Sequence, residues 1–423
     1  MYKNLNTSQL KETYRLLTKE YQKVKEKGLF LDMSRGKPAP DQLALSDPMN
    51  DIITSDIDFS NDGGLDVRNY GAPEGVPEAR EFFAKLFQVE TENVIVGGSS
   101  SLNLMFDAIG RAMIHGIMGS TPWSKLDKVK FLCPSPGYDR HFSITEYYNI
   151  EMIAIPMLED GPDMGTVARY VEEDEAVKGI WCVPKYSNPT GITYSERVVN
   201  AFASLKPKAK DFRIFWDNAY YVHDVFEADQ LYSIIKACEE AGNPDLVYQF
   251  ASTSKITYPG AGISAIVASK ANIKDTLDKL SYQTICYDKV NQLRHVRFLR
   301  DPDDLAAHMK KHAVMLAPKF QMVKEELEKE LASTGVAQWT NPNGGYFISV
   351  DVYPGTAKRT VALCKEAGLI LTGAGATFPY GKDPEDKNIR IAPTYPSVEE
   401  LKTAMELFCL CVRLAAVEKL MGQ

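Results

Sequence analysis

The stretch "LVYQFASTSK", residues 246–255, carries the strongest single indication of the fold. It begins as an apolar run with the aromatic and β-branched composition of a buried strand, and it ends in hydroxyl residues and Lys255. An ammonium group is costly to bury. The loop "ITYPGAG" (256–262) follows at once, so the sequence predicts a strand that delivers an amine into a cleft.

Further short apolar runs of the same kind alternate with helix-length segments such as 100–118 and 195–206. They are rich in Val, Ile and Phe and apolar on both faces, as the strands of a covered parallel sheet are. The runs lie at 93–98, 129–136, 151–157, 179–184, 212–218 and 263–269. This alternation predicts an α/β fold, with a three-layer α/β/α large domain around a mostly parallel sheet.

The pattern changes after about residue 300. A long helical stretch (303–333) precedes the strand-like "GGYFISVDV" (344–352), and the sequence closes on a helix at 397–421. These segments predict a smaller α+β domain. We expect residues 48–300 to form the large domain, and residues 1–47 with 301–423 to form the small one.

The N-terminal segment has the spacing of an amphipathic helix. We expect Thr7 or Ser8 to cap it and Gly28 to end it. Its apolar positions are Leu10, Tyr14, Leu17, Tyr21 and Val24.

Composition excludes several classes of protein. The 423 residues carry a net charge of −8 without a basic block, which argues against nucleic acid as a partner. No apolar stretch is long enough to span a membrane. The seven cysteines are odd in number and form no CxxC pair, and HExxH is absent, so neither a disulfide framework nor a metal site is expected. Charges throughout the N-terminal segment exclude a signal peptide, and we expect a cytoplasmic protein.

Polar residues follow several of the predicted strands, where ligands bind in parallel sheets. Each motif has an ordinary explanation taken alone: a turn that starts a helix, an Asn-Pro turn, or a helix cap. The motifs are "VGGSSSLNLMFDAIG" (96–110), "SNPTG" (187–191), "DNAYY" (217–221) and "STSK" (252–255).

Taken together, these groups suit one ligand, pyridoxal 5′-phosphate. That cofactor needs a lysine for its Schiff base and an acid beside its pyridine nitrogen, roles that Lys255 and Asp217 can fill. Asn188 and Tyr220 can reach the ring's phenolic oxygen, and the Ser/Gly elements can hold the phosphate.

The order of these motifs, with "SPGY" (135–138) and "RIA" (390–392), resembles fold-type I, class I/II aminotransferases of the aspartate aminotransferase superfamily. The resemblance covers roughly residues 30–420. Its finer pattern is similar to the aspartate aminotransferase subgroup often labelled MocR-type, without the winged-helix DNA-binding domain of MocR regulators.

The resemblance implies roles for individual residues. Lys255 would be the Schiff-base lysine and proton shuttle, with Asp217 on the pyridine nitrogen. Tyr138 would stack on the cofactor ring, and His141 would support Asp217 from behind. The phosphate would be lined by Gly98, Ser99, Ser100, Ser252 and Ser254.

Substrate and partner residues follow from the same resemblance. Arg390 would clamp the substrate α-carboxylate, with Asn188 and with Gly36 of "SRGKP" (34–38) nearby. Tyr70, in "RNYGAPEGVPEARE" (68–81), would reach the phosphate of a neighbouring subunit. Sites shared in this way imply a homodimer.

The sequence departs from the family pattern at Ile263, where many members place a phosphate-binding arginine eight residues after the lysine. Hydroxyl groups, Ser101 included, and a helix N-terminus would have to replace that charge, with Arg35 as a further candidate. The residue that binds a distal substrate carboxylate is also open. Its candidates are Lys289, Arg294, Arg297, Arg35 and Lys37.

The expected function is a ping-pong aminotransferase acting on amino and 2-oxo acids, with aspartate and 2-oxoglutarate as the best-supported pair. Two alternatives stay open at this point: a lyase or decarboxylase that uses the same cofactor, and a non-catalytic, cofactor-binding ligand sensor.

Overall fold

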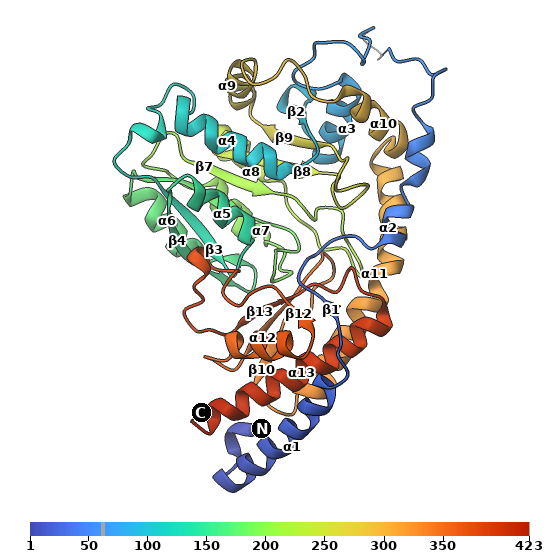
Figure 1. Ribbon diagram of the computed structural model, residues 1–423. Coiled ribbons are helices and arrows are strands. Elements are labelled where there is room, and N and C mark those ends of the chain that lie inside the picture. The colour runs from blue at the N-terminus through green and yellow to red at the C-terminus, as the bar shows by residue number, and fades with distance from the viewer. Residues whose placement is uncertain (61–63, 423) are drawn as a thin grey trace.

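The computed structural model describes residues 1–60 and 64–422, and its centre is an eight-stranded sheet (Figure 1). Five adjacent strands, β8, β7, β6, β3 and β4, are parallel, whereas β9 and β5 run antiparallel to their neighbours. In spatial order the strands are β2 (Val94–Gly97), β9 (Ser264–Ala268), β8 (Val247–Ser252), β7 (Arg213–Asp217), β6 (Val177–Cys182), β3 (Lys130–Ser135), β4 (Glu151–Leu158) and β5 (Gly161–Pro162).

Helices cover both faces of this sheet because its strands are apolar on both sides. Ile180 and Trp216 belong to one buried cluster, while Trp181 and Phe215, their neighbours in sequence, belong to another on the opposite face. The first cluster receives α3 (Pro77–Phe87), α6 (Met164–Glu173), α7 (Glu196–Ala203) and α8 (Ile234–Glu240). The second receives α4 (Ser101–His115), α5 (Asp139–Tyr147) and α9 (Lys270–Leu280). The predicted α/β/α arrangement with a mostly parallel sheet is confirmed.

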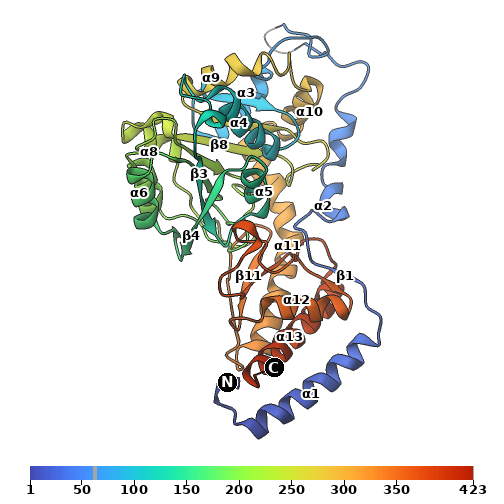
Figure 2. The ribbon, with the colours of Figure 1, turned by 60° about the vertical axis from the view of Figure 1, so that its left-hand side comes forward.

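A second body lies below the large sheet in Figures 1 and 2 and has its own core. Its antiparallel sheet consists of β10 (Ala337–Trp339), β11 (Ile348–Val352) and β13 (Asn388–Ile391). A parallel pair joins β1 (Leu31–Asp32) to β12 (Leu369–Ile370). Its helices are α1 (Thr7–Lys25), α12 (Ala357–Glu366) and α13 (Val398–Leu420). We call this body the small domain.

The long helix α11 (Pro302–Leu331) connects the two bodies, and α10 (Lys289–Leu299) precedes it. Figures 1 and 2 show α11 extending from the large sheet into the small domain. The remaining helix is α2 (Pro40–Ala44). Short 3-10 helices lie at Tyr2–Asn4, Asp47–Asp51, Thr91–Asn93, Trp123–Lys125, Pro244–Leu246 and Pro379–Gly381.

The N-terminal helix α1 confirms the amphipathic pattern but not its predicted cap. Asn6 is the capping residue: its side chain accepts from Gln9 N at 3.0 Å, and the Gln9 side chain accepts from Asn6 N at 2.9 Å. Thr7 and Ser8 lie in the first turn, so the predicted cap is wrong by one or two residues. This reciprocal capping box satisfies two backbone N–H groups at once. Within residues 1–60 and 64–422, no helix has the length and apolarity needed to cross a membrane.

Candidate active site

Most of the predicted site residues gather where the parallel strands end, facing the small domain. Asp217 is the last residue of β7 and Ser252 the last of β8, and these neighbouring strands pair Asp217 with Phe250. Lys255 follows in a tight turn, in which Ile256 N and Thr257 N both donate to Thr253 O at 2.9 Å. The carboxylate and the amine therefore lie on adjacent strand ends.

Asp217 is almost completely buried, with 2% of its surface exposed. Its Oδ2 accepts a hydrogen bond from His141 Nε2 at 3.0 Å, and the His141 ring stacks on Trp181 at 4.4 Å between centroids. Its Oδ1 is buried and has no hydrogen-bond partner among the described residues. A buried acceptor of this kind costs about 1–3 kcal/mol when left unpaired, so Oδ1 is suited to a donor that arrives with a ligand.

Burial lowers the pKa of Lys255, and the attraction of Asp217 opposes that effect. The amine lies 4.9 Å from the centroid of the Tyr220 ring. A lysine whose pKa is lowered is more often neutral, and only the neutral amine can attack a carbonyl or accept a proton. Tyr220 is itself buried, which raises the pKa of its phenol well above the ordinary value.

Tyr138 occupies the N-cap position of α5, and its ring meets His141 edge-on at 4.9 Å. Burial raises the pKa of Tyr138 to about 12, which keeps the phenol protonated. Tyr138 and His141 are three residues apart at the start of one helix, which brings their two rings together.

Arg390 extends from β13 of the small domain toward Asn188 of the large domain. Its Nη1 donates to Asn188 Oδ1 at 3.1 Å and to Asp139 Oδ1 at 2.9 Å, and its Nη2 donates to Thr372 Oγ1 at 3.1 Å. The guanidinium also lies 4.8 Å from the centroid of the Phe347 ring.

A guanidinium has five N–H donors, and three of those on Arg390 are used by the bonds above. Its Nε is buried and has no hydrogen-bond partner among residues 1–60 and 64–422, and the count of bonds leaves one N–H of Nη2 unused. Two donors thus stay available for a carboxylate. Gly36 lies close by, because a Cβ at that position would come within 2.4 Å of the Phe347 ring.

Asp139 and Thr372 are site residues that the sequence analysis missed. Asp139 directly follows Tyr138, the last residue of the "SPGY" motif, so an acidic residue in the first turn of α5 was an available signal. Thr372 has no such signal, because only the fold brings it to Arg390.

The predicted phosphate residues form one cradle at the start of α4. Ser100 caps the helix by accepting from Leu102 N at 3.1 Å. Ser254 Oγ donates to Ser99 O at 3.1 Å, and Ser252 Oγ donates to Ser254 Oγ at 3.1 Å. Ser264, which the sequence analysis did not single out, donates to Gly98 O at 2.7 Å.

Ile263 is 1% exposed and belongs to the apolar cluster on the first face of the large sheet. Its backbone N donates to Thr253 Oγ1 at 3.0 Å. The position is part of the core, which explains physically why no cation occupies it.

The other predicted residues are more scattered. Tyr70 is 74% exposed, and its side chain makes no hydrogen bond or ring contact with the described part of its own chain. Arg35 is exposed, and Lys37 lies 3.9 Å from the centroid of the Tyr395 ring. The three candidates on α10 have different surroundings. Lys289 is buried, Arg294 donates to Asn291 Oδ1 at 2.6 Å, and Arg297 donates to Asp58 O at 2.9 Å.

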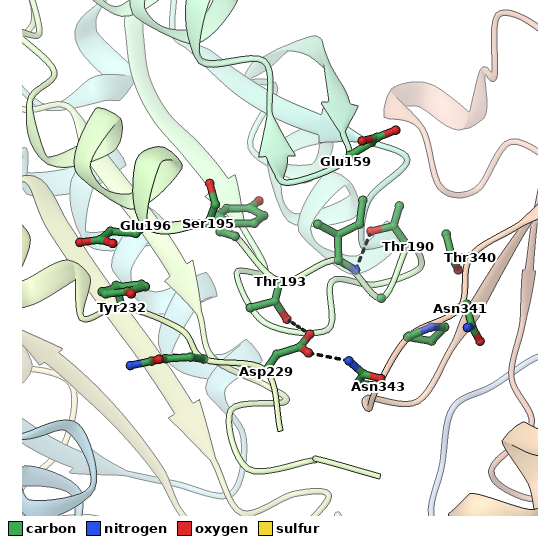
Figure 3. Close-up of a pocket in the computed structure, with 15 residues that line it drawn as sticks. Glu159, Thr190, Thr193, Ser195, Glu196, Asp229, Tyr232, Thr340, Asn341 and Asn343 are labelled. Atoms are coloured by element: carbon green, nitrogen blue, oxygen red, sulfur yellow. Dashed lines mark hydrogen bonds between the residues drawn. The ribbon is translucent and has the colours of Figure 1, made fainter. Parts of the chain in front are cut away.

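A separate hollow of about 770 Å³ lies beside the turn at residues 190–196. Figure 3 shows Thr193 and Asn343 both pointing at Asp229, and their bonds to its two oxygens are 2.7 and 2.8 Å long. Lys255 and Arg390 are not among the residues that line it, so this hollow is distinct from the candidate active site.

Comparison with known proteins agrees with this geometry. The family model described as aspartate amino-transferase matches residues 5–423. An aspartate aminotransferase of Corynebacterium glutamicum is 48% identical over 404 residues, which are 95% of this chain and 93% of the relative. A crystal structure of an aspartate transaminase from the same species covers 99% of both chains at 46% identity, with a TM-score of 0.97.

A more distant structure shares only the fold. LysN, an α-aminoadipate aminotransferase of Thermus thermophilus, is 19% identical, with a TM-score of 0.73 over 96% of this chain. The match over nearly the whole chain, together with the close relatives, shows that this protein is an aminotransferase that belongs to the aspartate aminotransferase family.

Proposed function

We propose that this protein transfers an amino group between aspartate and 2-oxoglutarate, with pyridoxal 5′-phosphate as its cofactor, in a ping-pong cycle. The observation that carries this proposal is the unpartnered, buried Oδ1 of Asp217 on the strand next to the one that leads to Lys255. A protonated pyridine nitrogen is the donor that such an oxygen lacks. The names of the close relatives support the choice of aspartate.

The residues present fit this cofactor at each of its ends. Asp217 would hold the ring nitrogen, Asn188 and Tyr220 would bind the ring oxygen, and Tyr138 would lie against the ring. When bound, the cofactor supplies an electron sink that stabilises negative charge at the substrate Cα. The phosphate would be held by the N-terminus of α4 and by neutral donors, namely Gly98, Ser99, Ser100, Ser252 and Ser254.

Lys255 would do the proton transfer. Its lowered pKa keeps a share of the amine neutral, so that Nζ can remove the proton from the Cα of the amino donor. In the second half of the cycle the same amine would return a proton to the Cα of the oxo acid. Arg390 would bind the substrate α-carboxylate through Nε and the free N–H of Nη2, a side-on pair that also fixes the orientation of the Cα–H bond.

We also propose that the protein works as a homodimer. A tyrosine that is 74% exposed suits contact with a second subunit, and Tyr70 would complete the partner's phosphate site. The free, mostly buried cysteines support a cytoplasmic location. The division into domains at residues 48–300 and 1–47 with 301–423 stays a proposal of the same kind.

The test is to incubate the cofactor-loaded protein with aspartate and 2-oxoglutarate and to measure all products. Transamination predicts oxaloacetate and glutamate in equal amounts. Ammonia or carbon dioxide instead would favour a lyase or decarboxylase, and cofactor binding without turnover of any amino donor would favour a sensor.

A further inference from the structure

Four of the six histidines lie in one buried region behind the turn that carries Lys255. None of them has a part in the chemistry proposed above. They come from different elements: one follows β7, one lies on α10, and two lie one helical turn apart on α11. They are His223, His295, His308 and His312.

Two carbonyl groups in the lysine turn explain the positions of three of these histidines, while His295 contacts Thr257 Oγ1 at 2.9 Å and Asn291 O at 2.8 Å. Lys255 O accepts from His223 Nε2 at 3.3 Å and from Tyr346 OH at 3.5 Å. Ile256 O accepts from His308 Nε2 at 2.9 Å and from His312 Nε2 at 3.1 Å. No backbone N–H in residues 1–60 or 64–422 reaches either carbonyl. Buried carbonyls without a main-chain partner require side-chain donors.

The bonds to Ile256 O assign the protons of His308 and His312 to their Nε2 atoms, which lie 3.2 Å apart and share this one acceptor. Because carbonyls only accept, His312 donates through Nε2, and its Nδ1 accepts from Gln42 Nε2 at 3.2 Å. The Gln42 carbonyl is already occupied by Ala39 N at 3.1 Å, so the Gln42 amide also donates to Tyr346 OH at 3.4 Å. Tyr346 is then left with its proton for Lys255 O.

The rings are neutral near pH 7. Burial lowers the pKa of His312 to about 4 and that of His223 to about 3, and it lowers the pKa of His308 as well. The network is therefore made of uncharged donors, each with an assigned acceptor.

The donor residues lie on three different elements outside the large sheet. Gln42 lies on α2, Tyr346 lies just before β11 of the small domain, and His312 lies on the helix that links the two bodies. Figure 1 shows α2 and α11 on the right of the large sheet and the small domain below it. Arg390, which would hold the substrate, also belongs to the small domain.

We propose that Gln42, His312 and Tyr346 are positioning residues: they fix the backbone of Lys255 relative to the small domain, so that the amine and the carboxylate clamp keep one geometry. This inference rests on the proposed function of Lys255. Loss of the network would let the lysine turn shift, which would change the surroundings of Nζ more than it changes substrate binding.

The test compares His312→Leu, which removes the donor, with His312→Gln, which retains an amide donor, and with Tyr346→Phe, which removes only a hydroxyl. Each variant is loaded with pyridoxal 5′-phosphate. The absorbance of the bound cofactor is titrated with pH, and kcat, KM and Tm are measured. Cys364→Ala, a buried change in the core of the small domain, serves as the control for simple destabilisation.

For His312→Leu we expect the midpoint of the absorbance titration to shift by at least half a pH unit. We also expect kcat to fall about tenfold, with KM within twofold of the parent. His312→Gln should recover most of both losses, Tyr346→Phe should show a smaller shift in the same direction, and Cys364→Ala should lower Tm without moving the midpoint.

An unchanged midpoint in both His312→Leu and Tyr346→Phe, with kcat reduced no more than in the control, would overturn the inference. If His312→Leu does not fold, Tyr346→Phe decides alone, because its ring still fills the core. If the parent protein shows no cofactor absorbance at all, the proposed function itself fails. If only the inference fails, the parent shows the absorbance and the variants titrate like the parent.

Discussion

The two ends of the candidate site are built on different physical principles. At the lysine end, Asp217 is 2% exposed and bonded to His141, whose ring packs against Trp181 and Tyr138. At the phosphate end, the donors are serine hydroxyls and a helix N-terminus, and the position of the family's arginine is occupied by Ile263 in the core. The first end depends on a few irreplaceable charges. The phosphate end distributes cofactor binding over several neutral donors, and each donor contributes little to the binding free energy.

The largest effect is expected from Lys255→Ala. Without the amine there is neither covalent attachment of the cofactor nor a base for the Cα proton, so kcat should fall by at least about 10⁴-fold. The cofactor should also become removable by dialysis. Stopped assays with purified, reloaded protein check both effects. A variant with more than one hundredth of the parent kcat would show that another group moves the proton.

Asp217→Asn should lower kcat by about 10³-fold, which corresponds to about 4 kcal/mol of transition-state stabilisation. The amide keeps the size of the side chain but cannot hold a protonated ring nitrogen by charge. Cofactor affinity should change far less than kcat. An equal loss in both quantities would mean that Asp217 binds the cofactor rather than tuning it.

Ile263→Arg places the cation of the family pattern at its usual sequence position. Because this position is 1% exposed and apolar, the charge should be left unpaired and destabilise the protein by about 3–5 kcal/mol. Cofactor affinity should not improve. Ile263→Val is the matched control, and denaturant unfolding with cofactor titration measures both quantities. Tighter cofactor binding in Ile263→Arg would show that the phosphate site still has room for the arginine.

Stability should decrease as the pH falls from 7 to 5. Burial lowers the pKa of His223 to about 3 and those of His295 and His312 to about 4, so the unfolded chain binds protons that the native protein does not. The histidines contribute fully to the stability above about pH 6.5, their ordinary pKa in the unfolded chain. That contribution is lost as the pH falls toward their pKa values in the folded protein. Each histidine should account for about 2 kcal/mol between pH 7 and pH 5. Unfolding curves that coincide at the two pH values would contradict this account.

The smallest effect is expected at the phosphate end. Replacing both Ser252 and Ser254 by alanine should weaken cofactor binding about tenfold, or about 1.4 kcal/mol, since the backbone donors of α4 stay in place. The value of kcat at saturating cofactor should hardly change. Binding as tight as in the parent would refute the idea that these hydroxyls replace the missing arginine.

The sequence predicted the parts of the site that lie next to each other along the chain or at strand ends. Asp217, Lys255 and the α4 loop were found because parallel strands bring their carboxyl ends to one edge of the sheet. The reverse direction of β9 could not be predicted from its composition, because a strand buried on both faces is apolar in either direction.

Contacts between distant segments were not predictable in the same way. Gln42, His312 and Tyr346 carry no motif and meet only when the small domain is in place. Thr372 and Arg390 come together for the same reason.

The most direct test of the central claim is to reduce the cofactor-loaded protein with borohydride and to map the modified peptide by mass spectrometry. Reduction makes the bond between a lysine and an aldehyde cofactor permanent. We expect one phosphopyridoxyl group per chain, attached to Lys255. Modification of other lysines with Lys255 unmodified, or no modification at all, would contradict it.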